Sequence, residues 1–349
     1  MPKFIILGDM HIGVKNASPV LCEYQLRFFE TQLFPYMEKH CIDTILQLGD
    51  LFDTRKFSNH VILHMWMTRF FDVIEAKKIK FITILGNHDL AYKNTLEVNS
   101  TSLFLKSYPS VKIIDKPTNE SICGVSFLLL PWIVEADRSH ISSSITNTES
   151  LFCAGHFEFS GFEVQKGIDA HGGEDSKNYD HFDIVFSGHY HTKHKKKNIL
   201  YTGTPYEMSW ADYGDQKGFH VFDTKKHKVD FVKNNIGLFY RLEYNDKNNS
   251  PDLEYGLGGS YVKVVVINKT DPHLFEKYIN HILLQNPTDL KITDIDHVFD
   301  SVDVSGSLKL DDTKTIMDNF IDKIETELDK KKIKDMMHSL YMNSLEKIE

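Results

Sequence analysis

The sequence predicts an α/β fold with a largely parallel sheet, and three observations lead to it. In the first half of the 349-residue chain, short apolar runs alternate with longer segments whose apolar residues have helical spacing. Each apolar run stops abruptly at polar or glycine residues, as strands do. Strands that are separated by helices form βαβ units, in which the strands lie parallel.

The elements follow in order from these patterns. Strands are expected at Phe4–Leu7, Thr44–Leu48, Phe81–Leu85, Val111–Ile114, Val125–Leu130, Leu151–Ala154 and Ile184–Phe186. Helices are expected at 21–39 and 59–77, and a hairpin at Phe219–Phe222 and Val229–Val232. After a linker at 245–259, a small αβ unit is expected from strand Tyr261–Ile267, helix 272–284 and strand Lys291–Asp296. A second linker at 300–310 precedes residues 311–349, which lack Gly and Pro and have helical periodicity.

The composition is that of a globular protein. Hydrophobic residues make up 41% and charged residues 26% of the chain, which excludes collagenous, disordered and disulfide-scaffold classes. No apolar run is long enough for a signal peptide or a membrane span, so no membrane association is expected. The four scattered cysteines are interpreted as buried thiols in a reducing cytoplasm. With a net charge of −9, contact with nucleic acid would have to be local.

Metal-capable side chains follow five of the expected strands, at the point where each strand ends. They are Asp9 with His11, Asp50, Asn87 with His88, His156, and His189 with His191. Ligand sites of open α/β sheets lie at the carboxyl ends of the strands, so the five loops should converge on one rim. Glycines before these residues allow sharp turns that bring the side chains inward.

The residue types in this set indicate transition metals. Carboxylates, imidazoles and one amide oxygen suit Mn²⁺, Fe²⁺ or Zn²⁺ better than Ca²⁺. Two ions sharing one carboxylate, roughly 3.5–4 Å apart, would hold both the attacking and the leaving oxygen of a phosphoryl displacement. The alternative is a series of ordinary turns and core histidines, because Asp and Asn favour turns for backbone reasons. Five such motifs in order argue against that alternative.

The motifs resemble those of the calcineurin-like metallophosphoesterases. That pattern is D-x-H, G-D-x-x-D, G-N-H-D/E, G-H and G-H-x-H, and this chain has it at Asp9–His11, Gly49–Asp53, Gly86–Asp89, Gly155-His156 and Gly188–His191. Within the superfamily the chain is similar to the DNA double-strand-break repair nucleases, which include the SbcCD-type bacterial exonucleases and the nuclease subunit of the T-even phage recombination endonuclease. The resemblance implies a four-layer α/β/β/α nuclease domain at 1–244, a capping domain at 260–300 and a helical ATPase-binding tail at 311–349.

The resemblance also implies roles for the motif residues. One ion would be held by Asp9, His11, Asp50 and His191, and a second by Asp50, Asn87, His156 and His189. The cofactors would be two divalent ions, with Mn²⁺ favoured, and a bridging water would be the nucleophile. His88 would stabilise or protonate the leaving oxygen, Asp89 would orient His88 or its loop, and Asp53 would tune His88.

By resemblance, the function is that of a DNA nuclease subunit with 3′→5′ double-strand exonuclease and single-strand endonuclease activity. Its partner would be an SMC-like coiled-coil ATPase, in a complex of two nuclease and two ATPase chains, in the host cytoplasm if the chain is phage-encoded. Two rivals stay open: a phosphatase or small phosphodiesterase on the same core, and a non-enzymatic scaffold for the ATPase. The protein phosphatases of this superfamily have Arg-Gly after the second motif, where the Arg grips a phosphomonoester. In this chain GDLFD is followed by Thr54-Arg55, which favours a phosphodiester substrate.

Two further segments are candidate contact surfaces. Lys193, Lys195, Lys196 and Lys197 follow the GHYH motif and are predicted to meet DNA phosphates, with a solvated turn as the equal alternative. In the tail, apolar residues at helical spacing either pack on this protein or bind a partner helix, and the resemblance favours the ATPase. The candidate partner residues are Ile316, Phe320, Ile324, Met336 and Leu340.

Overall fold

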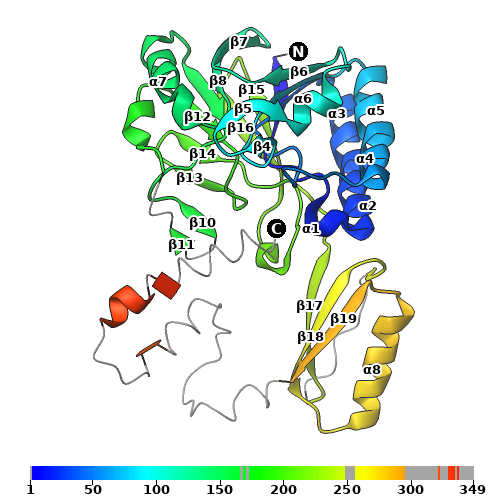
Figure 1. Ribbon diagram of the computed structural model, residues 1–349. Coiled ribbons are helices and arrows are strands. Elements are labelled where there is room, and N and C mark those ends of the chain that lie inside the picture. The colour runs from blue at the N-terminus through cyan, green and yellow to red at the C-terminus, as the bar shows by residue number, and fades with distance from the viewer. Residues whose placement is uncertain are drawn as a thin grey trace. The chain divides into compact units, whose positions relative to one another are not determined.

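The computed structural model describes residues 2–165, 168–169, 173–247, 256–294, 321–322, 329–334 and 336–337 (Figure 1). The chain divides into two units, Met1–Thr293 and Asp294–Glu349. The helices and strands named below lie in the first unit, except that the last residue of β19 is Asp294, where the second unit begins. In the second unit, residues 321–322, 330–334 and 336–337 are helical.

Two six-stranded sheets form the core of the first unit. The first sheet has the order β16-β15-β1-β2-β3-β6, with bounds β1 (Lys3–Leu7), β2 (Thr44–Gln47), β3 (Lys80–Ile84), β6 (Val111–Ile114), β15 (Gly218–Asp223) and β16 (Lys228–Lys233). The second has the order β13-β14-β12-β9-β8-β7, with bounds β7 (Thr118–Ile122), β8 (Val125–Leu130), β9 (Phe152–Gly155), β12 (Ile184–Ser187), β13 (His194–Lys196) and β14 (Ile199–Tyr201). The central strands of both sheets are parallel. The first sheet is antiparallel at one edge, through β15 and β16, and the second at both edges, through β13 and β7.

The two predicted N-terminal helices are present, each with a π-helical turn in the middle. The first consists of α2 (Pro19–Phe28), η1 (Phe29–Leu33) and α3 (Phe34–His40); the second of α4 (His60–Trp66), η2 (Met67–Phe71) and α5 (Asp72–Ala76). Ser18 and Asn59 accept hydrogen bonds from the first free N–H groups, which fixes where the helices begin. The two π turns contact each other through Phe29 and Phe70, whose ring centroids are 4.7 Å apart.

Side chains of the first sheet alternate between two cores. Ile5 and Leu7 of β1 join the apolar cluster beneath the helices, whereas Phe4 and Ile6 join a second cluster between the two sheets. This alternation is the period of two that a strand imposes. Figure 1 shows α2 to α5 together on one outer side of this unit.

Side chains of the second sheet also alternate between two cores, one between the sheets and one under a helix on the other outer side. Phe127 and Leu129 of β8 face the cluster between the sheets, and Leu128 and Leu130 pack with helix α7 (Arg138–Asn147) on the other outer side. Layers therefore follow in the order helix, sheet, sheet, helix. The predicted four-layer α/β/β/α core is confirmed.

Smaller elements connect these layers. They are α1 (Val14–Ala17), α6 (Ser100–Leu105), the ribbons β4 (Leu90–Tyr92) with β5 (Thr95–Asn99) and β10 (Glu163–Gln165) with β11 (Ile168–Asp169), and the 3₁₀ turns Glu135–Asp137, Ser176–Tyr179 and Trp210–Asp212. The sequence analysis did not predict the ribbons or β7, β13 and β14.

A small three-stranded sheet of order β17-β18-β19 packs against helix α8. Its elements are β17 (Phe239–Asn245), β18 (Tyr261–Asn268), α8 (Pro272–Leu284) and β19 (Asp289–Asp294). The predicted strand–helix–strand unit is thus present, with β17 as an additional strand parallel to β18. The predicted division into domains at 1–244, 260–300 and 311–349 stays a prediction.

Two expectations need comment. The prediction that all four cysteines are buried is wrong: Cys22 and Cys153 are buried, but Cys41 is exposed because it lies in the left-handed turn that ends α3. Among the residues that the structure describes, no helix is long and apolar enough to cross a membrane.

Candidate metal centre

The five predicted loops converge on one rim, as expected, but they come from two sheets rather than one. Loops after β1, β2 and β3 of the first sheet carry Asp9, His11, Asp50, Asn87 and His88. Loops after β9 and β12 of the second sheet carry His156, His189 and His191. Because the sheets pack face to face, the carboxyl ends of their central strands meet.

Glycine is required at two of these loops by close approach. A Cβ atom on Gly86 would lie 2.1 Å from Oδ1 of Asp50, and one on Gly188 would lie 2.5 Å from Oδ1 of Asp9. The two carboxylates therefore occupy space that any other residue would fill.

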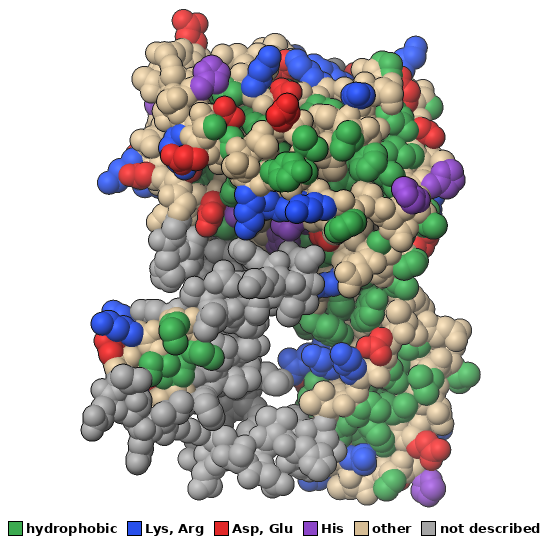
Figure 2. Space-filling view, in the orientation of Figure 1, with side chains coloured by type: hydrophobic (Ala, Val, Ile, Leu, Met, Phe, Trp, Pro, Cys, Tyr) green, Lys and Arg blue, Asp and Glu red, His purple; other side chains and the backbone are tan. Residues whose placement is uncertain are grey.

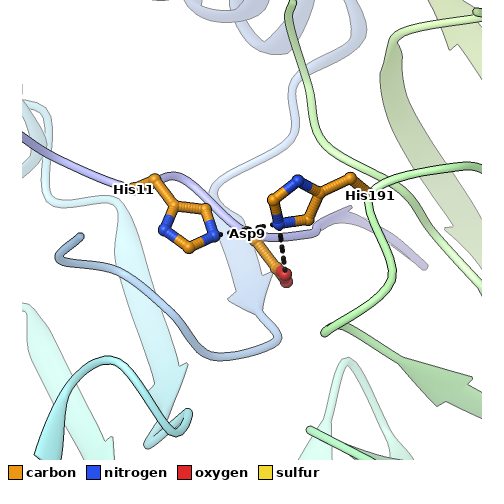
Figure 3. A group of neighbouring side chains, drawn as sticks. All are labelled: Asp9, His11 and His191. Atoms are coloured by element: carbon orange, nitrogen blue, oxygen red, sulfur yellow. Dashed lines mark hydrogen bonds and ion pairs between the residues drawn. The ribbon is translucent and has the colours of Figure 1, made fainter. Parts of the chain in front are cut away.

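The first ligand group consists of Asp9, His11 and His191, whose donor atoms lie within 4.8 Å of one another (Figure 3). Nε2 of His191 is 3.1 Å from Nε2 of His11 and 3.9 Å from Oδ2 of Asp9. Both oxygens of Asp9 also accept from the backbone N–H of His189, at 3.0 and 3.1 Å. This hydrogen bond joins the first sheet to the second.

The second ligand group consists of Asp50, His156 and His189. Nε2 of His156 is 3.2 Å from Oδ2 of Asp50 and 3.0 Å from Oδ1 of Asn87, so Asn87 belongs to the same group. Nδ1–H of His156 donates to the carbonyl of Leu48 at 2.8 Å, which leaves Nε2 to face the site. Asp50 lies between the groups, because its Oδ2 is also 3.9 Å from Nε2 of His11.

His88 stands beside both groups and is oriented by the backbone of Asp53. Nδ1–H of His88 donates to the Asp53 carbonyl at 2.7 Å, and the backbone N–H of His88 donates to Oδ1 of Asp50 at 2.8 Å. The Asp53 carboxylate faces His11 instead, with Oδ1 3.0 Å from Nδ1, at ion-pair distance but outside hydrogen-bond geometry. His11, Asp53 and His88 thus form a third group of close donor atoms.

Asp89 is fully buried and binds backbone rather than facing the rim. Its carboxylate accepts from the N–H groups of Gly86 at 2.8 Å, Phe52 at 3.0 Å and Leu51 at 3.4 Å. It therefore joins the loop after β2 to the loop after β3. This geometry suits the loop-orienting role predicted for it.

Carboxylates and imidazoles are crowded and buried at the rim, and they shift one another's pKa values. Burial raises the pKa of Asp9 to about 6, with Asp50 adding to the shift. Burial alone would raise the pKa of Asp50, but His156 and the other imidazoles hold this pKa well below its usual range. Although burial opposes their charge, Asp53 raises the pKa of His11 to about 10, and Asp50 with Asp9 raises that of His156 to about 9.

The predicted DNA-contacting lysines lie on and beside the edge strand β13. Lys193 donates to Gln216 at 2.7 Å, Lys196 donates to the Gly161 carbonyl at 2.9 Å, and Lys197 lies 3.7 Å from Asp180. Lysines on an edge strand also prevent it from pairing with another chain. Their role toward DNA stays a prediction.

Sequence reasoning gave Trp132 no role, although it lines the rim. Its ring centroid is 5.2 Å from that of His189 and 5.8 Å from that of His156. Its backbone N–H donates to the Leu85 carbonyl, directly before the third motif. It also lines a cavity of about 360 Å³ with His156, Phe157 and Arg138. The Pro131-Trp132 pair after β8 was the only signal for it.

The donor set fits divalent metal ions. Imidazole and carboxylate atoms converge from separate loops, and the distal nitrogens of His11 and His156 are oriented by Asp53 and Leu48, as is usual for metal-bound histidines.

The residues predicted to bind a partner lie in the tail. Of these, Ile316, Phe320, Ile324 and Leu340 lie outside the described residues, whereas Met336 is exposed.

Comparisons with known proteins agree with this arrangement. The calcineurin-like phosphoesterase family matches residues 2–193. Exonuclease subunit 1 of Enterobacteria phage T4 is 31% identical over 348 residues, covering 98% of this chain and 99% of that protein. The nuclease subunit of SbcCD from Staphylococcus epidermidis is 27% identical over 258 residues, covering 65% of this chain and 67% of that protein.

Solved structures are more distant. An archaeal phosphodiesterase has 13% identity and a TM-score of 0.32, covering 66% of this chain and 99% of that one. A hypothetical protein from Thermus thermophilus has 13% identity and a TM-score of 0.35, covering 63% of this chain and 91% of that one.

Proposed function

The chain belongs to the calcineurin-like phosphoesterase family, and from that premise we propose that it is a metal-dependent nuclease that hydrolyses phosphodiester bonds of DNA. The convergence of two ligand groups around Asp50 carries this proposal. The names of the T4 and staphylococcal relatives, an exonuclease subunit and a nuclease subunit, support DNA as the substrate. The cytoplasm remains the predicted location.

We assign the ligands of two ions from this geometry. Asp9, His11, Asp50 and His191 would hold the first ion, and Asp50, Asn87, His156 and His189 the second. Mn²⁺ is the proposed ion, since the mixed nitrogen and oxygen donors suit it. Bound ions of this class lower the pKa of water and stabilise the charge that develops on phosphoryl oxygens.

His88 is the proposed group that serves the leaving oxygen. Its Nδ1–H is taken by the Asp53 carbonyl, so Nε2 is the ring atom left to face substrate. The backbone N–H of His88 donates to Oδ1 of Asp50 at 2.8 Å, which ties the position of His88 to that of a proposed ligand. It can therefore hold or give a proton at the departing oxygen without binding an ion itself.

The finer activities rest on the resemblance to repair nucleases. We propose 3′→5′ exonuclease activity on double strands and endonuclease activity on single strands. An SMC-like ATPase would be the partner, bound by the tail at 311–349 through the predicted apolar residues. The exposure of Met336 (58%) supports a contact there with another chain.

An apolar patch supports a homodimer. Phe57 (81% exposed), Val61, Tyr92, Val98 and Leu103 (65% exposed) lie before and at the start of α4 and on β4, β5 and α6. Lys56 lies 6.0 Å above the Tyr92 ring, which joins the two parts of the patch. Figure 2 shows hydrophobic side chains gathered where Figure 1 draws β4, β5 and α6. A patch of this kind suits a second copy of the chain.

The test is digestion of end-labelled linear duplex DNA with Mn²⁺, by the wild type and by His88→Ala. We expect the wild type to shorten the labelled strand and His88→Ala to lose this activity while still binding Mn²⁺. The matched control is His140→Ala, an exposed histidine on α7 that should leave digestion unchanged.

Nitrophenyl phosphate esters separate the rival functions. A wild type that cleaves the monoester but no DNA, even with the ATPase added, would establish a phosphatase instead. A wild type that cleaves the diester but no DNA would be a small phosphodiesterase. A wild type that cleaves none of them would leave the scaffold as the function.

A further inference from the structure

A buried cation lies behind the loop that carries His189 and His191. Lys217 directly precedes β15, and its side chain is only 4% exposed. Lysine is almost never buried without a partner. The partners of Lys217 therefore indicate why a charge is kept at this position.

Lys217 contacts two carboxylates, those of Asp212 and Asp215, and the loop that carries His191. Its Nζ donates to Oδ1 of Asp212 at 2.6 Å and to the backbone carbonyl of His191 at 2.9 Å. It also lies 3.6 Å from Oδ2 of Asp215, and that oxygen accepts from the hydroxyl of Thr192 at 3.1 Å. The ammonium group thus holds His191 directly and Thr192 through the carboxylate of Asp215.

Asp212, whose carboxylate accepts from Lys217, is itself held by hydrogen bonds. Oδ2 of Asp212 accepts from the N–H groups of Met208 and Ser209, at 3.0 and 2.9 Å. On the other side, the N–H of Thr204 donates to the same His191 carbonyl at 3.1 Å. The main chain of His191 is consequently held from two directions.

The ring of His191 differs from the rings of His11 and His156, two of the other proposed ligands. Nδ1 of His156 is hydrogen-bonded to Leu48, and Nδ1 of His11 faces Asp53. Within the described part of the chain, the His191 ring has polar contacts only with His11 and Asp9, which belong to the ligand group itself. Its orientation therefore depends on its backbone more than theirs do.

We infer that Lys217 is a positioning residue for the metal centre, which fixes His191 through its backbone carbonyl and so takes the place of a hydrogen bond to the ring. The inference rests on the proposed metal centre. It assigns to Lys217 an effect on one of the two ions, the one held by Asp9, His11, Asp50 and His191.

The test measures Mn²⁺ binding to the full chain by titration calorimetry, for the wild type, Lys217→Met and the double variant Lys217→Met/Asp212→Asn. We expect two ions in the wild type and a 10- to 100-fold loss of affinity at one site in Lys217→Met, the loss typical of residues that support metal ligands. Lys112→Met is the control, since that lysine forms an exposed ion pair with Glu120.

The double variant distinguishes positioning from charge neutralisation. Replacing both members of a buried ion pair removes the uncompensated charge, so the double variant should regain the thermal stability that Lys217→Met loses. If Lys217 positions His191, the weakened site stays 10- to 100-fold weaker in the double variant. The double variant also serves if Lys217→Met does not fold.

Two outcomes would overturn the inference. If the double variant binds both ions as tightly as the wild type, Lys217 only neutralises Asp212. If the wild type binds no Mn²⁺, the proposed centre itself is refuted, and the inference with it.

Discussion

The two sheets contribute different chemistry to one site. Within the part of the chain that the structure describes, the first sheet supplies both carboxylates of the proposed ligand groups, Asp9 and Asp50, and the amide of Asn87. The second supplies only imidazoles, those of His156, His189 and His191. The negative charge that would neutralise bound metal ions is therefore concentrated on one half of the core.

This difference means that neither half makes a complete site. Among the residues that the structure describes, the proposed ligand groups take one imidazole from the first sheet, that of His11, and no carboxylate from the second. Direct contacts already join the halves at the rim, from His189 to Asp9 and from His156 to Leu48. Bound ions would add further links between the sheets, so metal binding and packing of the sheets should be coupled. Mutations and changes of metal, pH and salt can test this comparison.

Removing the shared carboxylate should have the largest effect. In Asp50→Asn both ligand groups lose the acid that connects them, so we expect DNA cleavage to fall by about 10⁴-fold or more, as when a catalytic unit is lost whole. Cleavage is measured as initial rate on labelled duplex, with Mn²⁺ bound per chain counted in parallel. Retention of two tightly bound ions would contradict the bridging position.

Removing His88, which lies beside the ligand groups, should cost less. We expect His88→Ala to reduce the rate constant by about 10²–10⁴-fold, the usual contribution of a positioned acid or base. Metal binding should be unchanged, because His88 is not assigned to either ion. A variant that lost an ion would show that His88 is a ligand, together with His11 and Asp53.

Removal of metal should destabilise the core. Ligand binding to the native state adds about 2.7 kcal/mol to the free energy of unfolding when free ligand is 100 times its dissociation constant. We therefore expect chelation to lower that free energy by about this amount per ion, measured by denaturant unfolding with Mn²⁺ and with EDTA. Asp50→Asn is the control, and its unfolding should not respond to EDTA.

Metal affinity should rise with pH between about 6 and 8. An ion must displace protons from His11 and His156, whose pKa values are about 10 and 9 in the metal-free chain. Each displaced proton gives about a tenfold gain in affinity per pH unit. Calorimetry in buffers of different ionisation enthalpy counts the protons released.

The metal-free protein should show the opposite trend. Histidines with raised pKa stabilise the fold below the unfolded value of about 6.5 and lose that contribution as pH rises through their folded pKa. The contribution of His11 and His156 to stability should thus fall above pH 6.5 with EDTA present. Metal affinity that does not change with pH would contradict the raised values.

The smallest effect is expected at the edge of the second sheet. Replacing Lys193, Lys195, Lys196 and Lys197 with Ala should reduce the salt slope of DNA binding by up to about 0.9 for each phosphate that is no longer neutralised. The measurement is log affinity against log salt concentration. An unchanged slope would leave these lysines with the role of protecting the edge strand.

The sequence located the side chains that converge at the rim because each one follows the end of a strand. Apolar runs followed by glycine and a donor located Asp9, Asp50, Asn87, His156 and His189 without knowledge of tertiary contacts. That the donors came from two sheets was not evident from periodicity, since strands of both sheets have the same pattern. The four layers were obtained from family resemblance.

Other features could not be predicted because they depend on distant partners. Lys217 has no local signal, because lysine is usually exposed and its partner His191 is 26 residues away. The orientation of Asp53 toward His11 rather than His88 depends on how two loops meet. Strand β17 was missed because its pairing with β18 crosses the predicted linker.

The close fit of Gly86 and Gly188 against the two carboxylates has a consequence for how the site can change. A hydrogen atom, the smallest possible side chain, separates each backbone from a ligand oxygen. The closest approach of these loops to the carboxylates is therefore set by the main chain and not by side-chain rotamers. Substitution at the ligand positions can change which ion is preferred. The distance between the carboxylates and the loops of Gly86 and Gly188 would stay the same.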